Sequence, residues 1–91
     1  MLSLGEVIKD LLRAYGIDEA VKMHRATVLW EEVVGSTIAR NSKALGVRGK
    51  MLFVKTRSSA WRNEIALQKD VILRAINDKI GSNLIKDIRL R

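Results

Sequence analysis

The sequence contains no cysteine and no proline, and only four of its residues are phenylalanine, tryptophan or tyrosine. Without cysteine, the chain forms neither a disulfide framework nor a thiolate metal site. It also lacks an apolar run of the roughly 18–20 residues that a membrane span needs. Residues 1–6 lack the basic stretch and long apolar run of a secretory signal peptide. These absences predict a cytoplasmic protein that makes no use of a membrane.

Recognisable catalytic motifs are missing as well. No Walker-type glycine loop, nucleophile elbow or dinucleotide fingerprint occurs. His24 is the only histidine, and no second histidine or cysteine is present to complete a metal-ligand cluster. Glu31 and Glu32 are adjacent on a predicted helix, so their side chains point about 100° apart and make a poor acid–base pair. We therefore predict that the protein is not an enzyme and uses no cofactor, metal ion or small-molecule substrate.

Composition and periodicity indicate one small α+β domain over residues 1–91. Hydrophobic residues make up 47% of the chain, which is typical of a folded protein. Apolar positions recur at helical spacing from Leu4, after a capping Ser3, to a predicted stop at Gly16. A second helix, capped by Asp18, continues to residue 38, and Gly35 inside it predicts a bend.

The second half of the chain changes from helical to strand-like spacing and back. Residues 43–47 and 51–57 are short aliphatic segments around Gly49, which predicts a β-hairpin. Ser58 or Ser59 caps a long helix over residues 60–80, with Leu67, Val71 and Leu73 widening its apolar side. Residues 84–91 form a third strand. The resulting order α-α-β-β-α-β predicts a three-stranded sheet covered by helices, with a right-handed crossover if the last two strands are parallel.

Positive charge is concentrated in the middle of the sequence. The net charge is +7, and residues 40–62 hold seven basic residues and no acidic one. Such a self-repelling segment is typical of proteins that bind an anionic polymer, although solubility alone is the alternative explanation. Strand alternation places four cations on the open face of the sheet: Lys55, Arg57, Arg89 and Arg91. Phe53 lies on the same face, and its ring either stacks on a base or simply packs on the sheet. The predicted nucleic-acid contacts are Arg40, Lys43, Arg48, Lys50, Lys55, Arg57, Arg62, Arg89 and Arg91.

Two blocks of sequence and the final strand resemble the DciA family of small bacterial proteins. Residues 30–39 (WEEVVGSTIA), followed by Asn41 and Ser42, resemble its W-x-x-(V/I)-V-G-x-x-(I/L)-A…(H/N)-S block. Residues 49–65 resemble its G-x-L-x-V…S-x-x-W-x-x-E-L block, and residues 88–91 fit its terminal strand. The similarity covers nearly the whole chain from about residue 4. The chain departs from many relatives in having Lys43-Ala44 where they have a proline. We also expect it to do without the long basic extension that many relatives carry.

The resemblance implies a K-homology-like fold and a place in bacterial DNA replication. It also implies DNA binding and a partnership with the replicative helicase DnaB, whose loading or activity family members support. The residues themselves leave three functions open: DNA binding, RNA binding, and a scaffold that docks on the helicase or on a second copy. The scaffold hypothesis expects the apolar residues of the first helix to be partly exposed. DNA and RNA are not separated by the sequence, because phosphate contacts dominate both kinds of binding.

Overall fold

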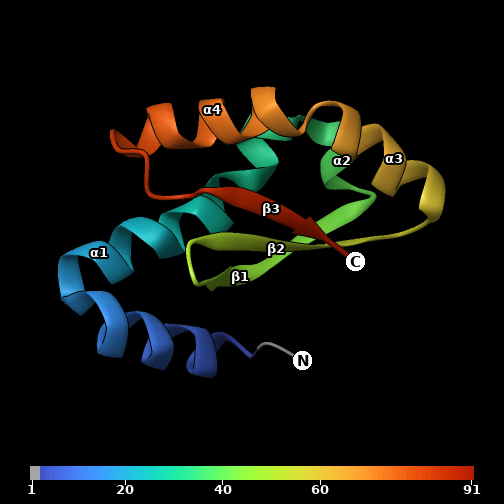
Figure 1. Cartoon of the computed structure of the whole chain (residues 1–91). Coiled ribbons are helices and arrows are strands. Elements are labelled where there is room, and N and C mark those ends of the chain that lie inside the picture. Colours follow the sequence, from blue (N-terminus) through green and yellow to red (C-terminus); the bar gives the residue numbers. More distant parts are fainter. Residues whose placement is uncertain (1–2) are drawn as a thin grey trace.

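The computed structural model describes residues 3–91, apart from the side chains at positions 11, 15, 18 and 19. The elements are α1 (Leu4–Val34), α2 (Ser36–Ala39), β1 (Ser42–Arg48), β2 (Met51–Thr56), α3 (Ser59–Leu67), α4 (Lys69–Ile80) and β3 (Asp87–Leu90). This is a small α+β domain, as predicted, and the elements follow the predicted order except that two helices, α3 and α4, stand where one was predicted (Figure 1). No helix in the described part of the chain is both long and apolar enough to cross a membrane.

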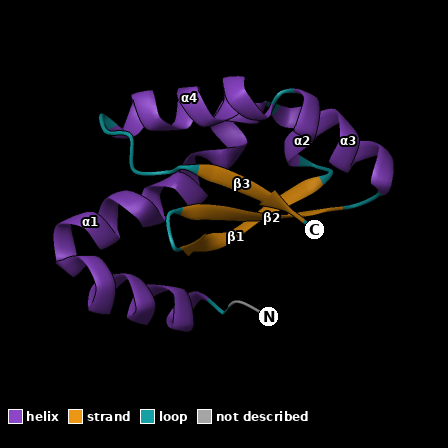
Figure 2. Cartoon of the chain, viewed as in Figure 1, coloured by secondary structure: helices purple, strands orange, loops and turns teal. Residues whose placement is uncertain are grey.

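The three strands form one mixed sheet in the order β1-β2-β3 (Figure 2). β1 and β2 are antiparallel, and β3 is parallel to β2, so α3 and α4 form the crossover between β2 and β3. Gly49 and Lys50 both have positive φ angles, 59° and 64°, as a two-residue hairpin turn requires. The predicted hairpin is therefore confirmed, with the lysine also in the left-handed region.

The core lies on one face of this sheet. Leu52, Val54 and Ile88 from the strands are fully buried against α1 and α4, and Trp30 of α1 is the largest fully buried side chain among them. Of the alternating residues of β2 and β3, Lys55 and Arg89 are exposed, and Met51, Phe53 and Asp87 are half-buried. α4 and the second part of α1 thus cover one face, and the opposite face is open except near the hairpin turn, where Val7 of the first part of α1 lies against Gly46 (Figure 1).

Glycines divide the first helical region as the sequence predicts. The Ser3 hydroxyl accepts a hydrogen bond from the Glu6 N–H at 3.1 Å and caps α1. Gly16, with φ 80° and ψ −179°, bends α1 into two parts, and Gly35 ends it with φ 85° (Figure 1). The predicted cap Asp18 has its side chain outside the described residues.

The single long helix predicted over residues 60–80 is wrong. Ser58 caps α3 through its hydroxyl, but α3 ends before Gln68, whose φ of −103° and ψ of 6° separate it from α4. Leu67 and Val71 are 85% and 67% exposed, so their predicted place on the apolar side is also wrong. On α4, Val71 is turned about 100° from Ile72, which is buried, and the break at Gln68 separates Leu67 from that helix. The prediction placed them by their hydrophobicity, whereas the position of a residue around its helix decides whether it is buried.

The third strand is shorter than predicted, because it begins at Asp87. Leu84 and Ile85 precede it and are both buried, so they do not alternate between faces. Asn77 of α4 holds this loop: its amide nitrogen donates to the Ile85 carbonyl at 2.9 Å, and its oxygen accepts from the Ile85 N–H at 3.0 Å. In the loop before β3, these two hydrogen bonds to a buried asparagine side chain take the place of hydrogen bonds to a neighbouring strand.

Candidate nucleic-acid interface

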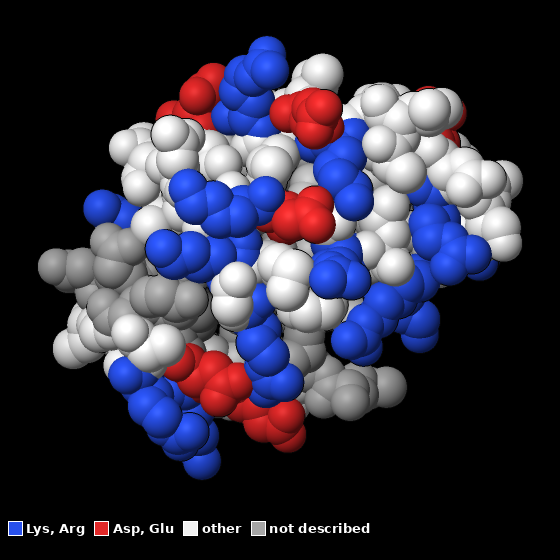
Figure 3. Space-filling view, viewed as in Figure 1, with Lys and Arg blue, Asp and Glu red and all other residues white. Residues whose placement is uncertain are grey.

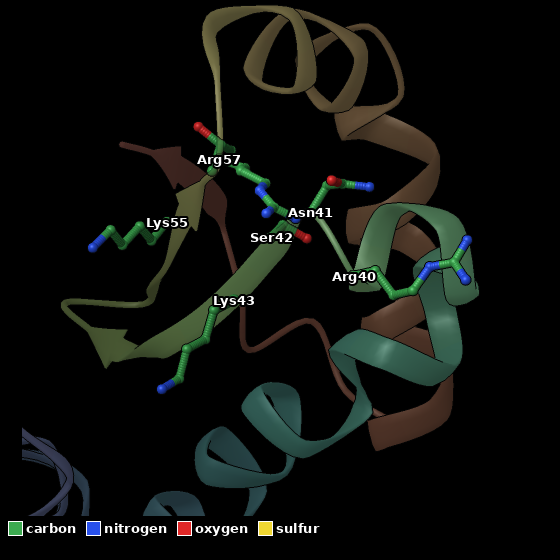
Figure 4. A pocket seen from close by; sticks show the side chains of 7 residues that line it. Arg40, Asn41, Ser42, Lys43, Lys55 and Arg57 are labelled. Carbon is green, nitrogen blue, oxygen red and sulfur yellow. The ribbon is translucent and has the colours of Figure 1, made fainter.

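A shallow hollow lies where β1 begins and β2 ends (Figure 4). Its volume is about 230 Å³. Four of its seven lining residues are cationic and none is acidic: Arg40, Asn41, Ser42, Lys43, Lys55, Thr56 and Arg57 line it. A concave surface with one sign of charge concentrates counter-ions, so this hollow favours an anionic ligand.

The wall of this hollow is fixed by hydrogen bonds to the helices. The Ser42 hydroxyl accepts from the Trp30 indole N–H at 3.0 Å and donates to the Ile38 carbonyl at 2.7 Å. The Asn41 side-chain amide donates to the Thr37 carbonyl at 2.8 Å. Strand β1 therefore starts at one defined position relative to α1 and α2, which fixes where the backbone of Lys43 lies.

Two lysines face each other across the hairpin in this hollow. Lys43 of β1 pairs with Lys55 of β2 in the antiparallel register, and both side chains are exposed. Like charges directly opposite each other in a sheet destabilise it. An anion bound between them relieves this repulsion, so the register itself favours anion binding.

A second hollow of about 470 Å³ adjoins the first on the open sheet face. It shares Lys43, Lys55 and Thr56 with the first hollow and adds Leu45 and Arg91. We call the joint surface the basic groove. Its cations on this side of the sheet are Lys43, Lys55, Arg57 and Arg91.

Arg91 is held in the groove by its main chain and its side chain. The Arg91 main-chain oxygen accepts from the Thr56 N–H at 2.7 Å and from the Thr56 hydroxyl at 2.6 Å. Its guanidinium carbon lies 5.0 Å from the centre of the Phe53 ring, at the distance of a cation–π contact. Phe53 is half-buried, so its ring supports an arginine on the open face.

Two predicted contacts are engaged elsewhere. Arg48 is 2.6 Å from the Asp10 carboxylate of α1, so part of its charge is neutralised within the molecule. Arg89 lies opposite Phe53 on β3, and its Nε donates to the Met51 sulfur at 3.4 Å. Arg89 therefore stays on the open face, whereas Arg48 is turned toward α1.

The remaining predicted contacts are dispersed. Arg40 lines the first hollow, but Figure 4 shows its side chain directed away from Lys43 and Lys55. Lys50 in the hairpin turn and Arg62 on α3 line neither hollow. The structure thus brings together five of the nine predicted residues along the two hollows and leaves four outside them.

The surface charge is also uneven: one region is purely basic and the rest is mixed. In Figure 3, Lys and Arg side chains gather without acidic neighbours near the end of β3 and the β2–α3 connection, at the lower right. Over the rest of this face, acidic and basic side chains are interspersed. The unbalanced positive charge therefore lies at the end of the sheet that carries the basic groove.

Three polar residues of the groove are absent from the predicted contacts: Asn41, Ser42 and Thr56. Asn41 and Ser42 belong to the first family block, so the sequence motif singles them out. Their hydrogen bonds to the helices, which orient the wall of the hollow, are visible only in the structure. Among the described residues, no group of three histidine, cysteine, aspartate or glutamate side chains is placed to hold a metal ion.

Comparisons with known proteins identify the family of this chain. The family model described as "Dna[CI] antecedent, DciA" matches residues 3–90. A UPF0232 protein of Corynebacterium glutamicum is 31% identical over 88 residues, which are 97% of this chain and 49% of that protein. A UPF0232 protein of Rhodococcus jostii is 32% identical over 71 residues, or 76% of this chain and 38% of that protein. The chain thus spans about half the length, or less, of these curated relatives. Because the family model covers almost every residue, the chain belongs to the DciA family.

Proposed function

We propose that this chain is a non-catalytic, nucleic-acid-binding accessory of the bacterial replicative helicase, acting in the cytoplasm. Membership of the family described as "Dna[CI] antecedent" supports the link to helicase loading, which the resemblance to this family implies. The observation that carries the nucleic-acid part is the basic groove, in which cations line a hollow without an acidic residue among the lining side chains.

The shape of the groove suits a sugar–phosphate backbone. It is open and lies along the end of the sheet, and its cations come from β1, β2 and the end of β3. Lysine ammonium groups contact phosphates as point charges, and arginine guanidinium groups contact them as forks. Lys43, Lys55 and Arg57 act as backbone contacts that position a strand, and such contacts carry no base sequence.

The Arg91–Phe53 pair favours single-stranded nucleic acid. An arginine plane supported by an aromatic ring offers an exposed stacking surface beside the phosphate contacts. Unstacked bases are available only in single strands, loops and ends. We therefore expect single strands to bind better than duplexes of equal length. DNA is preferred on the basis of family membership, and RNA is the alternative.

Fluorescence anisotropy tests this proposal with labelled single-stranded DNA, duplex DNA and single-stranded RNA of matched length, each at several salt concentrations. Binding that weakens with salt and is tightest for single-stranded DNA supports it. If RNA binds most tightly, the ligand is RNA and the basic groove remains its proposed binding site. No binding at low salt refutes the nucleic-acid part.

The helicase part needs its own test. Analytical ultracentrifugation of the chain mixed with purified DnaB measures whether a complex forms without nucleic acid. Co-sedimentation supports an accessory role. The accessory role is refuted if the chain binds DNA but forms no complex with DnaB, whether DNA is present or absent.

A protein-interaction scaffold remains a second candidate function, and one observation favours it. Several large aliphatic side chains of α1 are exposed, as the scaffold hypothesis expects. This surface is on a different element from the basic groove, so both functions fit on one domain.

A further inference from the structure

The first helix exposes two apolar stripes, one on each side of its bend at Gly16. Six large aliphatic side chains of α1 are between 37% and 70% exposed: Leu4, Ile8, Leu12, Ile17, Val21 and Val28. Their spacing of mostly four residues places them along one side of each part of the helix. Isolated exposed aliphatic residues are ordinary on a protein surface, whereas a contiguous set indicates an interaction site.

The two stripes meet in a hollow inside the bend. Its volume is about 180 Å³, room for one or two aliphatic side chains. Ile8 and Leu12 line it from the first part of α1, and Ala20, Val21, His24 and Arg25 line it from the second. Figure 1 shows the two parts of α1 at an angle to each other, which makes this surface concave. We call it the bend hollow.

Basic residues lie beside the bend hollow; Asp18 and Glu19 also belong to the bend, and their side chains lie outside the described residues. Arg25 lines the hollow, and Lys9 and Arg13 are exposed one residue beyond Ile8 and Leu12. None of the described lining residues is acidic. Glu6 and Glu31 are exposed toward the far ends of the two stripes, and the Asp10 carboxylate faces Arg48 instead.

We propose that the bend hollow is a docking site for an amphipathic helix of a partner protein, with acidic residues flanking its apolar side. A leucine-sized side chain of that helix fills the hollow, and neighbouring apolar residues cover the stripes on Ile17 and Val21. The acidic flank meets Arg25, Lys9 and Arg13, which gives charge complementarity. This is the helix-in-groove mode of recognition.

The charge and the shape argue against two other occupants. A two-fold dimer centred on this hollow places the Arg25 side chains of both copies near each other. A membrane suits a straight amphipathic helix with a continuous apolar side, whereas this surface is bent and hollowed. A helix of opposite flanking charge fits both features.

Anisotropy with two designed peptides tests this inference. Both are helices of about 20 residues with the same leucine side, and one has glutamates and the other lysines along its flanks. Val21→Asn alters the hollow, and Val71→Asn is the matched control, because Val71 is also an exposed helical valine but lies on α4. The acidic peptide is expected to bind, and Val21→Asn is expected to weaken that binding by about tenfold or more. Val71→Asn leaves it unchanged.

Other outcomes overturn the proposal. Absence of binding, equal binding of both peptides, or equal loss in both variants each does so. Concentration-dependent dimers abolished by Val21→Asn assign the surface to a second copy, and binding to anionic vesicles abolished by Val21→Asn assigns it to a membrane. DNA binding of Val21→Asn is measured alongside. Since Val21 is remote in sequence from the basic groove residues and lines neither of its hollows, retained DNA binding with lost peptide binding separates this site from the proposed nucleic-acid function.

Discussion

The salt dependence of nucleic-acid binding is the sharpest consequence of the basic groove. Four cations line it on the open side of the sheet: Lys43, Lys55, Arg57 and Arg91. If each contacts one phosphate of a single strand, the slope of log K against log salt is about −2.8. Raising the salt concentration from about 50 to about 200 mM then weakens binding about 50-fold.

Replacing Lys55 and Arg57 with glutamine removes two of these contacts. The slope then falls to about −1.4, and the same rise in salt weakens binding only about sevenfold. Lys86→Gln with Arg74→Gln is the matched control, because it removes the same charges from exposed positions that line neither hollow. Its slope should stay close to that of the unchanged chain.

Anisotropy titrations of single-stranded DNA at four or more salt concentrations measure all three slopes. Equal loss of slope in both double variants means that net charge alone, and no particular groove, drives binding. An unchanged slope after replacement of Lys55 and Arg57 refutes the assignment of this groove. Circular dichroism of each variant confirms that the fold is retained.

Three further predictions concern what holds the groove and the sheet together, and urea unfolding measures each of them. Ser42→Ala leaves the buried indole N–H of α1 without its acceptor and should lower the free energy of unfolding by about 1–3 kcal/mol; a loss below about 0.5 kcal/mol contradicts this. Asn77→Ala breaks both hydrogen bonds to the loop before β3 and should cost about 3 kcal/mol, and no loss of stability would show that the loop is held otherwise. Gly46→Ala should cost about 2 kcal/mol or more, because its Cβ would lie 2.7 Å from a methyl group of Val7. Gly5→Ala, which has no neighbour within 4 Å of its new Cβ, serves as the control and should not destabilise the chain.

Local signals predicted the elements well where a residue type forces the backbone. The turn at Gly49, the bend at Gly16 and the cap at Ser58 all follow from the conformational freedom of glycine or from a side-chain oxygen near a helix start. The helix break at Gln68 carries no such signal, since neither glycine nor proline stands there. The break lies between two helices whose buried sides pack on the same core, so packing decided it.

The candidate site was predicted only in part. Strand alternation placed Lys55 and Arg91 on the open face correctly, because side-chain direction in a strand depends on local periodicity. The pairing of Arg48 with Asp10 joins residues that are far apart in the sequence, and no local pattern reveals it. The hydrogen bond from Trp30 to Ser42 is likewise a tertiary contact, although both residues belong to one sequence block.

The sequence by itself determined the class of fold, the order of elements and the concentration of positive charge in residues 40–62, because each depends on composition or on short-range spacing. The tertiary structure decided which charges act together. The antiparallel register sets Lys43 opposite Lys55, and the addition of β3 parallel to β2 brings Arg91 beside them. It also decided that the apolar residues around the bend in α1 stay exposed, since burial depends on which surface meets the sheet and not on hydrophobicity alone.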